Sequence, residues 1–150
     1  MKPEEQKYLY DKYPKIFRQK DLPMSETCMC WGICVDSGWL KLIDTLCEEI
    51  AQHVETENTY GDTGKTLHFE AVQVKEKFGG LRFYYDGGDE RISGMVNMAQ
   101  AMSFNICETC GNAGQLYRRK GGFWIKTLCP ACAEKEGFAK VENNKEYKVI

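Results

Sequence analysis

The chain has 150 residues, enough for one domain with a core of its own. Its 20 Lys and Arg residues against 22 Asp and Glu residues give a formal charge of −2, which argues against generic duplex binding because such proteins carry strongly basic surfaces. The N-terminus lacks the apolar core of a signal peptide and the chain has no apolar run of about 18 residues, so we expect a soluble cytoplasmic protein without a membrane partner.

The first third of the sequence predicts two helices. Residues 3–19 are charged with interspersed aromatic side chains and an internal proline, which predicts a short helix followed by a docked arm. Further along, Asp36 or Ser37 is placed to cap a second, amphipathic helix. Its buried stripe recurs at three- and four-residue intervals and comprises Trp39, Ile43, Leu46, Cys47, Ile50 and Val54. The polar residues 55–66 that follow predict an exposed loop.

A β-hairpin is predicted next, with strands at residues 67–78 and 81–85. Gly79 and Gly80 separate the strands, and two glycines there favour a two-residue turn because glycine accepts a positive φ. This register would place Lys77 opposite Arg82 and Lys75 opposite Tyr84. The expected core face carries Val72, Val74, Phe78, Leu81, Phe83 and Tyr85. The expected outer face carries Phe69, Ala71, Gln73, Lys75, Lys77, Arg82 and Tyr84.

A third helix completes the main domain. Asp89 is its expected N-cap, and its apolar stripe would lie on the hairpin: Ile92, Met95, Val96, Ala99 and Met102. We therefore predict an α+β fold: a small antiparallel sheet (hairpin 67–85) packed by two amphipathic helices, with a C-terminal zinc-ribbon-like module. The expected divisions are an α+β domain at 1–106, the module packed on it at 107–137 and a charged tail at 138–150.

The module is predicted from two C-x-x-C pairs, which are separated by 18 residues. Each pair places two thiolates on one tight turn, and this spacing is typical of a tetrahedral zinc site. The four expected ligands are Cys107, Cys110, Cys129 and Cys132. Four protein ligands leave no open position on the metal, which indicates a structural Zn²⁺ without catalytic chemistry. Between the pairs, Gly121 and Gly122 predict a second hairpin that places Arg119 opposite Trp124.

Four more cysteines do not fit a usual zinc pattern. Cys47 lies on a helical apolar stripe, where a free thiol packs as a small hydrophobe. For Cys28, Cys30 and Cys34, free thiols and a second metal site both stay open. No candidate nucleophile or open metal site emerges elsewhere. The segment ending in Gly64-Lys65-Thr66 does not predict a phosphate loop either, because Thr59 stands where the motif needs its first glycine. We therefore do not expect an enzyme.

The outer face of the first hairpin is the predicted ligand site. It mixes Lys75, Lys77 and Arg82 with the ring of Tyr84, a combination that suits a phosphate and a stacked base. Trp31 is a candidate second stacking wall. The alternative interpretation is that the lysines keep an exposed sheet face soluble and prevent edge-to-edge pairing.

Three segments together resemble a family of small proteins carried by tailed phages and prophages. The shared features are Trp-Gly followed by Gly-Trp, a Val-Lys-x-Lys-Phe-Gly-x-Leu-Arg-Phe/Tyr run and a terminal C-x-x-C zinc module. In this sequence they correspond to Trp31, Gly32, Gly38, Trp39, Lys75, Lys77, Phe78, Gly79, Leu81 and Arg82 together with the four module cysteines. The resemblance implies a phage setting, in which small accessory proteins often counter host defence and some sequester nucleotide signals.

The leading hypothesis is a non-enzymatic, phage-type binding protein in the cytoplasm of the infected host. Its ligand would be an anionic, nucleotide-like immune signal held by Lys75, Lys77, Arg82, Tyr84 and Trp31. One alternative is an inhibitor or adaptor of a host defence protein, with the zinc ribbon and tryptophans as contact surface. Another, less favoured, is single-stranded nucleic-acid binding through both basic hairpins. The ligand and the oligomeric state stay open.

Overall fold

The computed structural model describes residues 1–141, so most of the expected charged tail, residues 142–150, lies outside the described residues. Within the described part, the predicted α+β class is confirmed, with strand orders β1-β2-β3 and β5-β4-β6 in two separate sheets. The elements are α1 (Pro3–Lys12), β1 (Ile33–Cys34), α2 (Leu40–Tyr60), β2 (Phe69–Lys77), β3 (Gly80–Gly87), α3 (Glu90–Ser103), β4 (Gln115–Arg119), β5 (Ile125–Leu128), α4 (Pro130–Glu136) and β6 (Phe138–Lys140).

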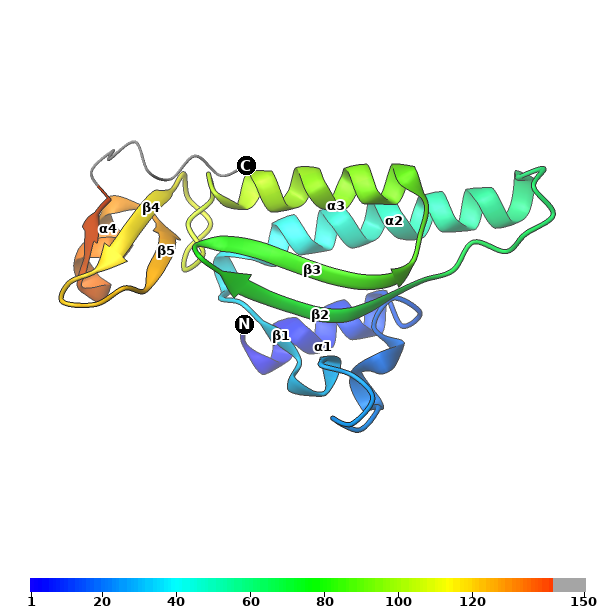
Figure 1. Ribbon diagram of the computed structural model, residues 1–150, viewed down its shortest axis with the longest axis horizontal. Helices are drawn as coiled ribbons and strands as arrows, with labels where there is room; N and C mark the ends of the chain where they lie inside the picture. Colours follow the sequence, from blue (N-terminus) through cyan, green and yellow to red (C-terminus); the bar gives the residue numbers. More distant parts are fainter. Residues whose placement is uncertain (142–150) are drawn as a thin grey trace.

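Helices α2 and α3 lie side by side along the long β2–β3 hairpin, and α1 lies near β1 (Figure 1). The predicted stripe of α2 is confirmed, since Trp39, Ile43 and Ile50 are fully buried. Helix α2 runs beyond the predicted loop start to Tyr60, because no helix breaker occurs before Gly61 and the extra polar turn projects into solvent. Asp89 caps α3 as predicted, with its carboxylate accepting from the Ile92 amide at 2.9 Å.

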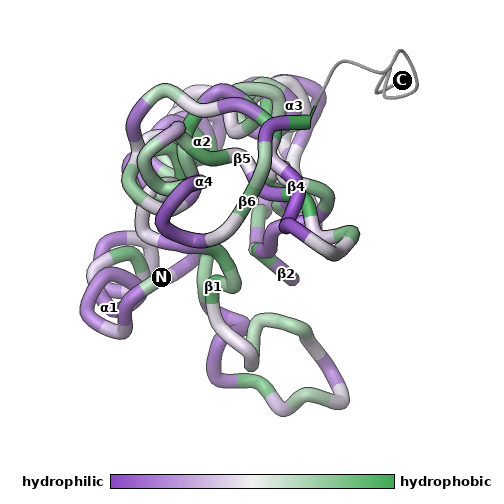
Figure 2. The backbone as a smooth tube through the Cα atoms, turned by 90° about the vertical axis from the view of Figure 1, so that its left-hand side faces the viewer, coloured by the Kyte–Doolittle hydropathy of each residue, from purple (hydrophilic) through white to green (hydrophobic). Residues whose placement is uncertain are grey.

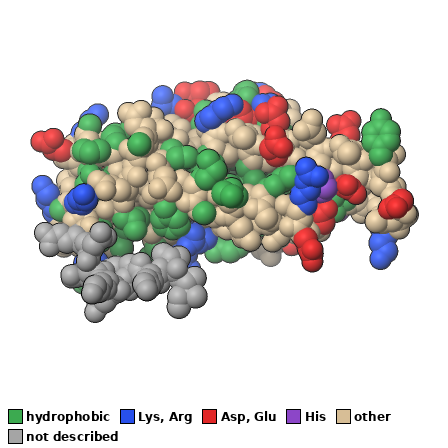
Figure 3. Space-filling view, turned by 90° about the horizontal axis from the view of Figure 1, so that it is seen from above, with side chains coloured by type: hydrophobic (Ala, Val, Ile, Leu, Met, Phe, Trp, Pro, Cys, Tyr) green, Lys and Arg blue, Asp and Glu red, His purple; other side chains and the backbone are tan. Residues whose placement is uncertain are grey.

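The stripe of α3 is only partly buried. Val96 and Ala99 lie in the core, but Met95 is half-buried and Met102 is 46% exposed. Met98, one turn before Met102, is 63% exposed. Seen over α2 and α3, hydrophobic side chains gather in the middle of the surface (Figure 3). These methionines therefore contribute to an exposed apolar surface and only in part to the core.

The predicted turn of the first hairpin was wrong by one residue. Lys77 pairs with Gly80, so the two turn residues are Phe78 and Gly79, both with positive φ (52° and 82°). Gly80 therefore lies in the strand, at a position where a Cβ would come 2.3 Å from Cζ of Phe104. Lys75 therefore faces Arg82, and Phe78, which the pattern assigned to the core, is 69% exposed.

A β-bulge also changes the faces of β2. The register shifts between Ala71 and Gln73, so the strict alternation of sides is interrupted at half-buried Val72. Phe69 and Ala71, predicted on the outer face, are buried in the core. On the strand's other side, Glu70 accepts hydrogen bonds from Arg18 at 2.6 and 2.9 Å, and this guanidinium lowers the pKa of its carboxyl.

The C-terminal module has its own small core and a sheet of three strands (Figure 2). The predicted register of its hairpin is confirmed, because Arg118 pairs with Ile125 and the Arg119 amide donates to the Trp124 carbonyl at 2.8 Å. The module is longer than predicted: residues 138–140 form β6 beside β4, and Phe138 is 4% exposed. Residues 138–140, which the prediction assigned to the charged tail, therefore belong to the sheet of the module, and Phe138 packs in its core.

No helix within residues 1–141 has both the length and the apolar character needed to cross a membrane.

Candidate functional site

The four module cysteines converge on one point. Their sulfur atoms all lie within 4.8 Å of one another, although 18 residues separate the two pairs in the sequence. Cys107 and Cys110 sit on the turn that precedes β4, while Cys129 and Cys132 sit at the start of α4. Sheet pairing of β4 with β5 brings the two turns together. The cluster can hold a metal ion.

The geometry and the chemistry of the cluster both suit a thiolate-bound ion. A tetrahedral shell with metal–sulfur bonds of about 2.3 Å separates its sulfurs by about 3.8 Å, and Sγ of Cys110 lies 3.7 Å from Sγ of Cys129. The Cys132 amide points at Sγ of Cys129 and lowers the pKa of this thiol to about 7. Thiolate is the form that binds metals, so this amide favours the metal-binding form of Cys129.

The other cysteines do not gather in this way. Cys28 and Cys34 are exposed, Cys30 is half-buried, and Cys47 is fully buried in the core. The thiols of Cys30 and Cys34 donate to nearby backbone carbonyls at 3.3 and 3.4 Å. Among residues 1–141, the module cysteines are the only group of three or more potential ligand side chains close enough to share an ion.

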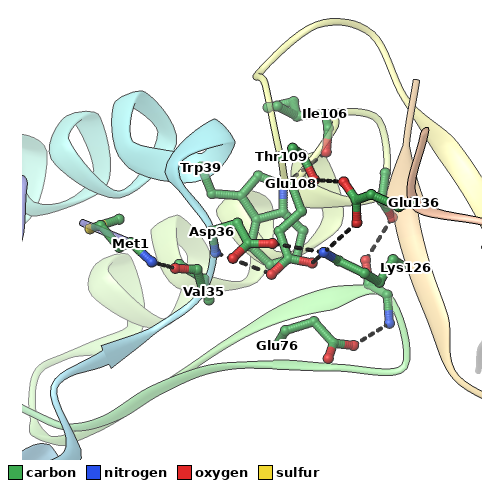
Figure 4. Close-up of polar contacts among 12 residues, drawn as sticks. Met1, Val35, Asp36, Trp39, Glu76, Ile106, Glu108, Thr109, Lys126 and Glu136 are labelled. Carbon is green, nitrogen blue, oxygen red and sulfur yellow. Dashed lines mark hydrogen bonds and ion pairs between the residues drawn. The ribbon is translucent and has the colours of Figure 1, made fainter. Parts of the chain in front are cut away.

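A charge cluster centred on buried Lys126 joins the cysteine-bearing module to the main domain (Figure 4). Lys126 on β5 is 4% exposed, and its ammonium lies 2.7 Å from Oδ2 of Asp36, 3.4 Å from Oε2 of Glu136 and 3.9 Å from Oε2 of Glu108. Glu108 accepts a hydrogen bond from the Asp36 amide at 3.2 Å. Nothing in the sequence pattern predicted this cluster, because its members are scattered over a hundred residues and resemble ordinary surface charges.

Burial governs the charges of this cluster. It raises the pKa of Glu108 to about 7, although the neighbouring Lys126 ammonium acts in the opposite direction. For Lys126, burial opposes the charged form, but the hydrogen bond to Asp36 and the Glu108 carboxyl outweigh it and raise the pKa. Oε2 of Glu108 is buried without a hydrogen bond within the described residues, so Lys126 is its main electrostatic partner. The cluster is therefore sensitive to loss of any one member.

The first hairpin presents the predicted basic residues on one side. Lys75 and Arg82 are direct cross-strand neighbours, and Lys77 and Tyr84 follow on the same face by alternation. Within residues 1–141, none of the three cations forms an ion pair with a carboxylate. The Arg82 guanidinium donates to the Leu81 carbonyl at 2.9 Å, and the Lys77 ammonium lies 5.6 Å from the centre of the Phe78 ring. We call Lys75, Lys77, Arg82 and Tyr84 the basic face.

A hollow adjoins the basic face at one end. The hollow has a volume of about 480 Å³ and is lined by Tyr84, Gln73 and residues 24–28. The Tyr84 side chain is 42% exposed. Trp31, the fifth predicted ligand residue, is 67% exposed but lines a different hollow beside Tyr10 and Lys20. The structure thus brings four of the predicted ligand residues together and separates Trp31 from them.

The cysteine cluster and the basic face are the two candidate sites that sequence and structure share. Comparisons with protein-family models, with curated proteins and with solved structures found no match for this chain.

Proposed function

We propose that the chain is a non-enzymatic binding protein whose basic face holds an anionic ligand. The observation that carries this proposal is the direct pairing of Lys75 with Arg82, without a carboxylate partner in residues 1–141. Like charges opposite each other on a sheet are destabilising. A bound phosphate would relieve this repulsion and accept hydrogen bonds from both side chains.

A nucleotide is the ligand class that best uses the surroundings of the basic face. The exposed ring of Tyr84 offers a stacking surface, and the adjoining hollow adds the polar side chains of Gln73 and Thr27. The resemblance to small phage proteins supports a narrower version, in which the ligand is a nucleotide immune signal of an infected host.

For the cysteine cluster we propose Zn²⁺ in a structural role. Four thiolates in a compact set are a preferred environment of zinc in proteins, and they fill its tetrahedral shell. The metal would then stabilise the module and leave the chemistry of recognition to the basic face.

The proposal is tested by titrating mononucleotides and cyclic nucleotides against the metal-loaded protein in a calorimeter. We expect at least one of them to bind, and removal of two charges in K75Q/R82Q to weaken it by roughly tenfold or more, because each charge-assisted hydrogen bond contributes about 1.5–3 kcal/mol. The matched control is Lys135→Gln, an exposed lysine on α4 remote from the hairpin, which should bind as the parent does.

Two results would count against this function. Absence of heat and of a thermal shift with every nucleotide would leave the lysines as solubilising residues. Affinity for single-stranded DNA or RNA alone, falling steeply with salt, would instead favour a nucleic-acid-binding protein.

A further inference from the structure

A large apolar groove lies on the side of the molecule formed by α2 and α3, and it is not part of the basic face. Its volume is about 940 Å³. The floor is made of aliphatic and thioether side chains from both helices: Leu42, Leu46, Met95, Met98, Ala99 and Met102. Cys110 and Gly111, on the turn that precedes β4, close one end of the groove. The first turns of α1 form part of its wall. Met98 and Met102, the two exposed methionines of α3, both line this groove.

The charged side chains around the groove are mostly acidic. Glu4, Glu5, Asp44 and Glu49 line it, against Lys41 as its one cationic lining residue within the described chain. Asp44 is already neutralised, since it accepts from Lys12 at 2.9 Å and from Tyr13 at 2.6 Å. Glu4 and Glu49 are exposed and form no ion pair within residues 1–141. An apolar floor with unneutralised carboxylates at its rim is complementary to an apolar stripe flanked by basic side chains.

We propose that this groove docks an amphipathic helix of another protein, one with an apolar stripe bordered by Lys and Arg. A helix fits because its apolar residues at positions i, i+3, i+4 and i+7 form one stripe that can lie along a groove between two helices. Methionines suit such a floor, since their flexible, polarizable side chains adapt to an incoming surface. Burying two exposed thioethers also supplies a hydrophobic driving force.

The carboxylates at the rim of the groove disfavour two other possible occupants, a second copy of this chain and an anionic lipid surface. A second copy of this chain, bound through the same face, would bring two acidic rims together and repel at close range. An anionic lipid surface would be repelled by the same carboxylates. The docking site goes beyond the proposed anion-binding function, because it uses the opposite charge sign and another part of the surface.

The test uses two helical peptides of about 18 residues with identical leucine stripes. One carries Lys and the other Glu at all remaining positions, and binding to the full metal-loaded chain is measured by fluorescence anisotropy. We expect the Lys peptide to bind and the Glu peptide to bind at least about tenfold more weakly. The double variant M98Q/M102Q should lose roughly tenfold or more of the affinity for the Lys peptide, because each methionine buries apolar area on docking.

The control for the methionine change is Met24→Gln, which alters a 72% exposed methionine outside the groove and should bind as the parent does. A charge exchange, E4K/E49K, should weaken the Lys peptide by roughly tenfold and strengthen the Glu peptide, which a merely unfolded variant would not do. Equal binding of both peptides, or unchanged binding by M98Q/M102Q, would overturn the proposal. Sedimentation of the parent as a dimer that M98Q/M102Q dissociates would overturn it too, because a second copy would then fill the groove.

Discussion

Gly80 carries no side chain because the ring of Phe104 fills the space where one would lie. A Cβ on Gly80 would approach the Phe104 ring to 2.3 Å, and the hairpin turn is fixed on its other side by the Thr127 hydroxyl, which donates to the Gly79 carbonyl at 2.6 Å. The neighbour Gly79 has a different task, since it supplies a positive φ to the turn. A Cβ on Gly79 would also come 2.5 Å from Cδ2 of Leu116, so both glycines satisfy a packing requirement and Gly79 a backbone requirement as well.

At this scale we predict that Gly80→Ala destabilises the protein by about 1–3 kcal/mol, because the Phe104 ring must move to admit a methyl group. The matched control is Gly94→Ala in α3, where a Cβ meets nothing within 4 Å. This control should stabilise the protein by about 0.5–1 kcal/mol through helix propensity. Chemical denaturation measures both changes, and a neutral Gly80→Ala would show that the close contact carries no constraint.

The zinc-ribbon-like module is the element whose stability depends most on the cysteines. Its buried core consists of Tyr117, Leu128, Ala133 and Phe138 with Cys107 and Cys129, too few apolar side chains for an independent domain. The sulfur cluster closes this core, so a metal there would cross-link the two turns that enclose the sheet.

We therefore predict one zinc ion per chain in parent protein and none in Cys110→Ser. The melting temperature should fall by roughly 10 °C or more in this variant, because loss of the metal removes several kcal/mol of folding free energy. The control is Cys34→Ser, since both cysteines are exposed but Cys34 lies outside the cluster. Metal analysis with thermal unfolding, repeated with a chelator, checks the prediction. Full zinc content in Cys110→Ser would rule out a four-cysteine site.

The module and the main domain are held together by contacts from several distant segments. The Trp39 indole donates to the Ile106 carbonyl at 2.8 Å, and the Gly38 amide donates to the Glu108 carbonyl at 2.7 Å. Around these bonds lies the charge cluster centred on Lys126. Because this cluster links β5 to the loop before α2, it connects the zinc-ribbon-like module to the main domain.

At the scale of the molecule we predict that Lys126→Met lowers the free energy of unfolding by about 2–4 kcal/mol in saturating zinc, since it leaves buried Glu108 without a cation. Lys120→Met, an exposed lysine of the same module, is the control and should change stability by less than about 0.5 kcal/mol. Adding Glu108→Gln to Lys126→Met should recover part of the loss in a double-mutant cycle. Denaturant unfolding measures the free energy of unfolding of Lys126→Met, of Lys120→Met and of the double variant. Parent-like stability of Lys126→Met would mean that the cluster does not hold the module to the main domain.

Local features of the sequence predicted much of this fold. The stripe of α2 and the Asp89 cap could be predicted because helical periodicity and capping depend on residues a few positions apart. The four-cysteine cluster could be predicted for a similar reason, since each C-x-x-C pair forms its own turn. The register of the second hairpin could be predicted from Gly121 and Gly122, and Arg119 lies opposite Trp124 as expected.

The remaining features were decided by contacts between distant segments. The first hairpin turn lies one residue earlier than its glycine pair predicts, with Gly80 packed against the ring of Phe104, and the bulge at Val72 turned Phe69 inward. The sequence by itself therefore determined the helical faces and the thiol set, because these arise from local spacing. Only the tertiary structure decided which cations are neighbours on the first hairpin, which carboxylates surround Lys126 and which methionines are exposed. These features depend on strand register and burial, and both are set by packing partners remote in the chain.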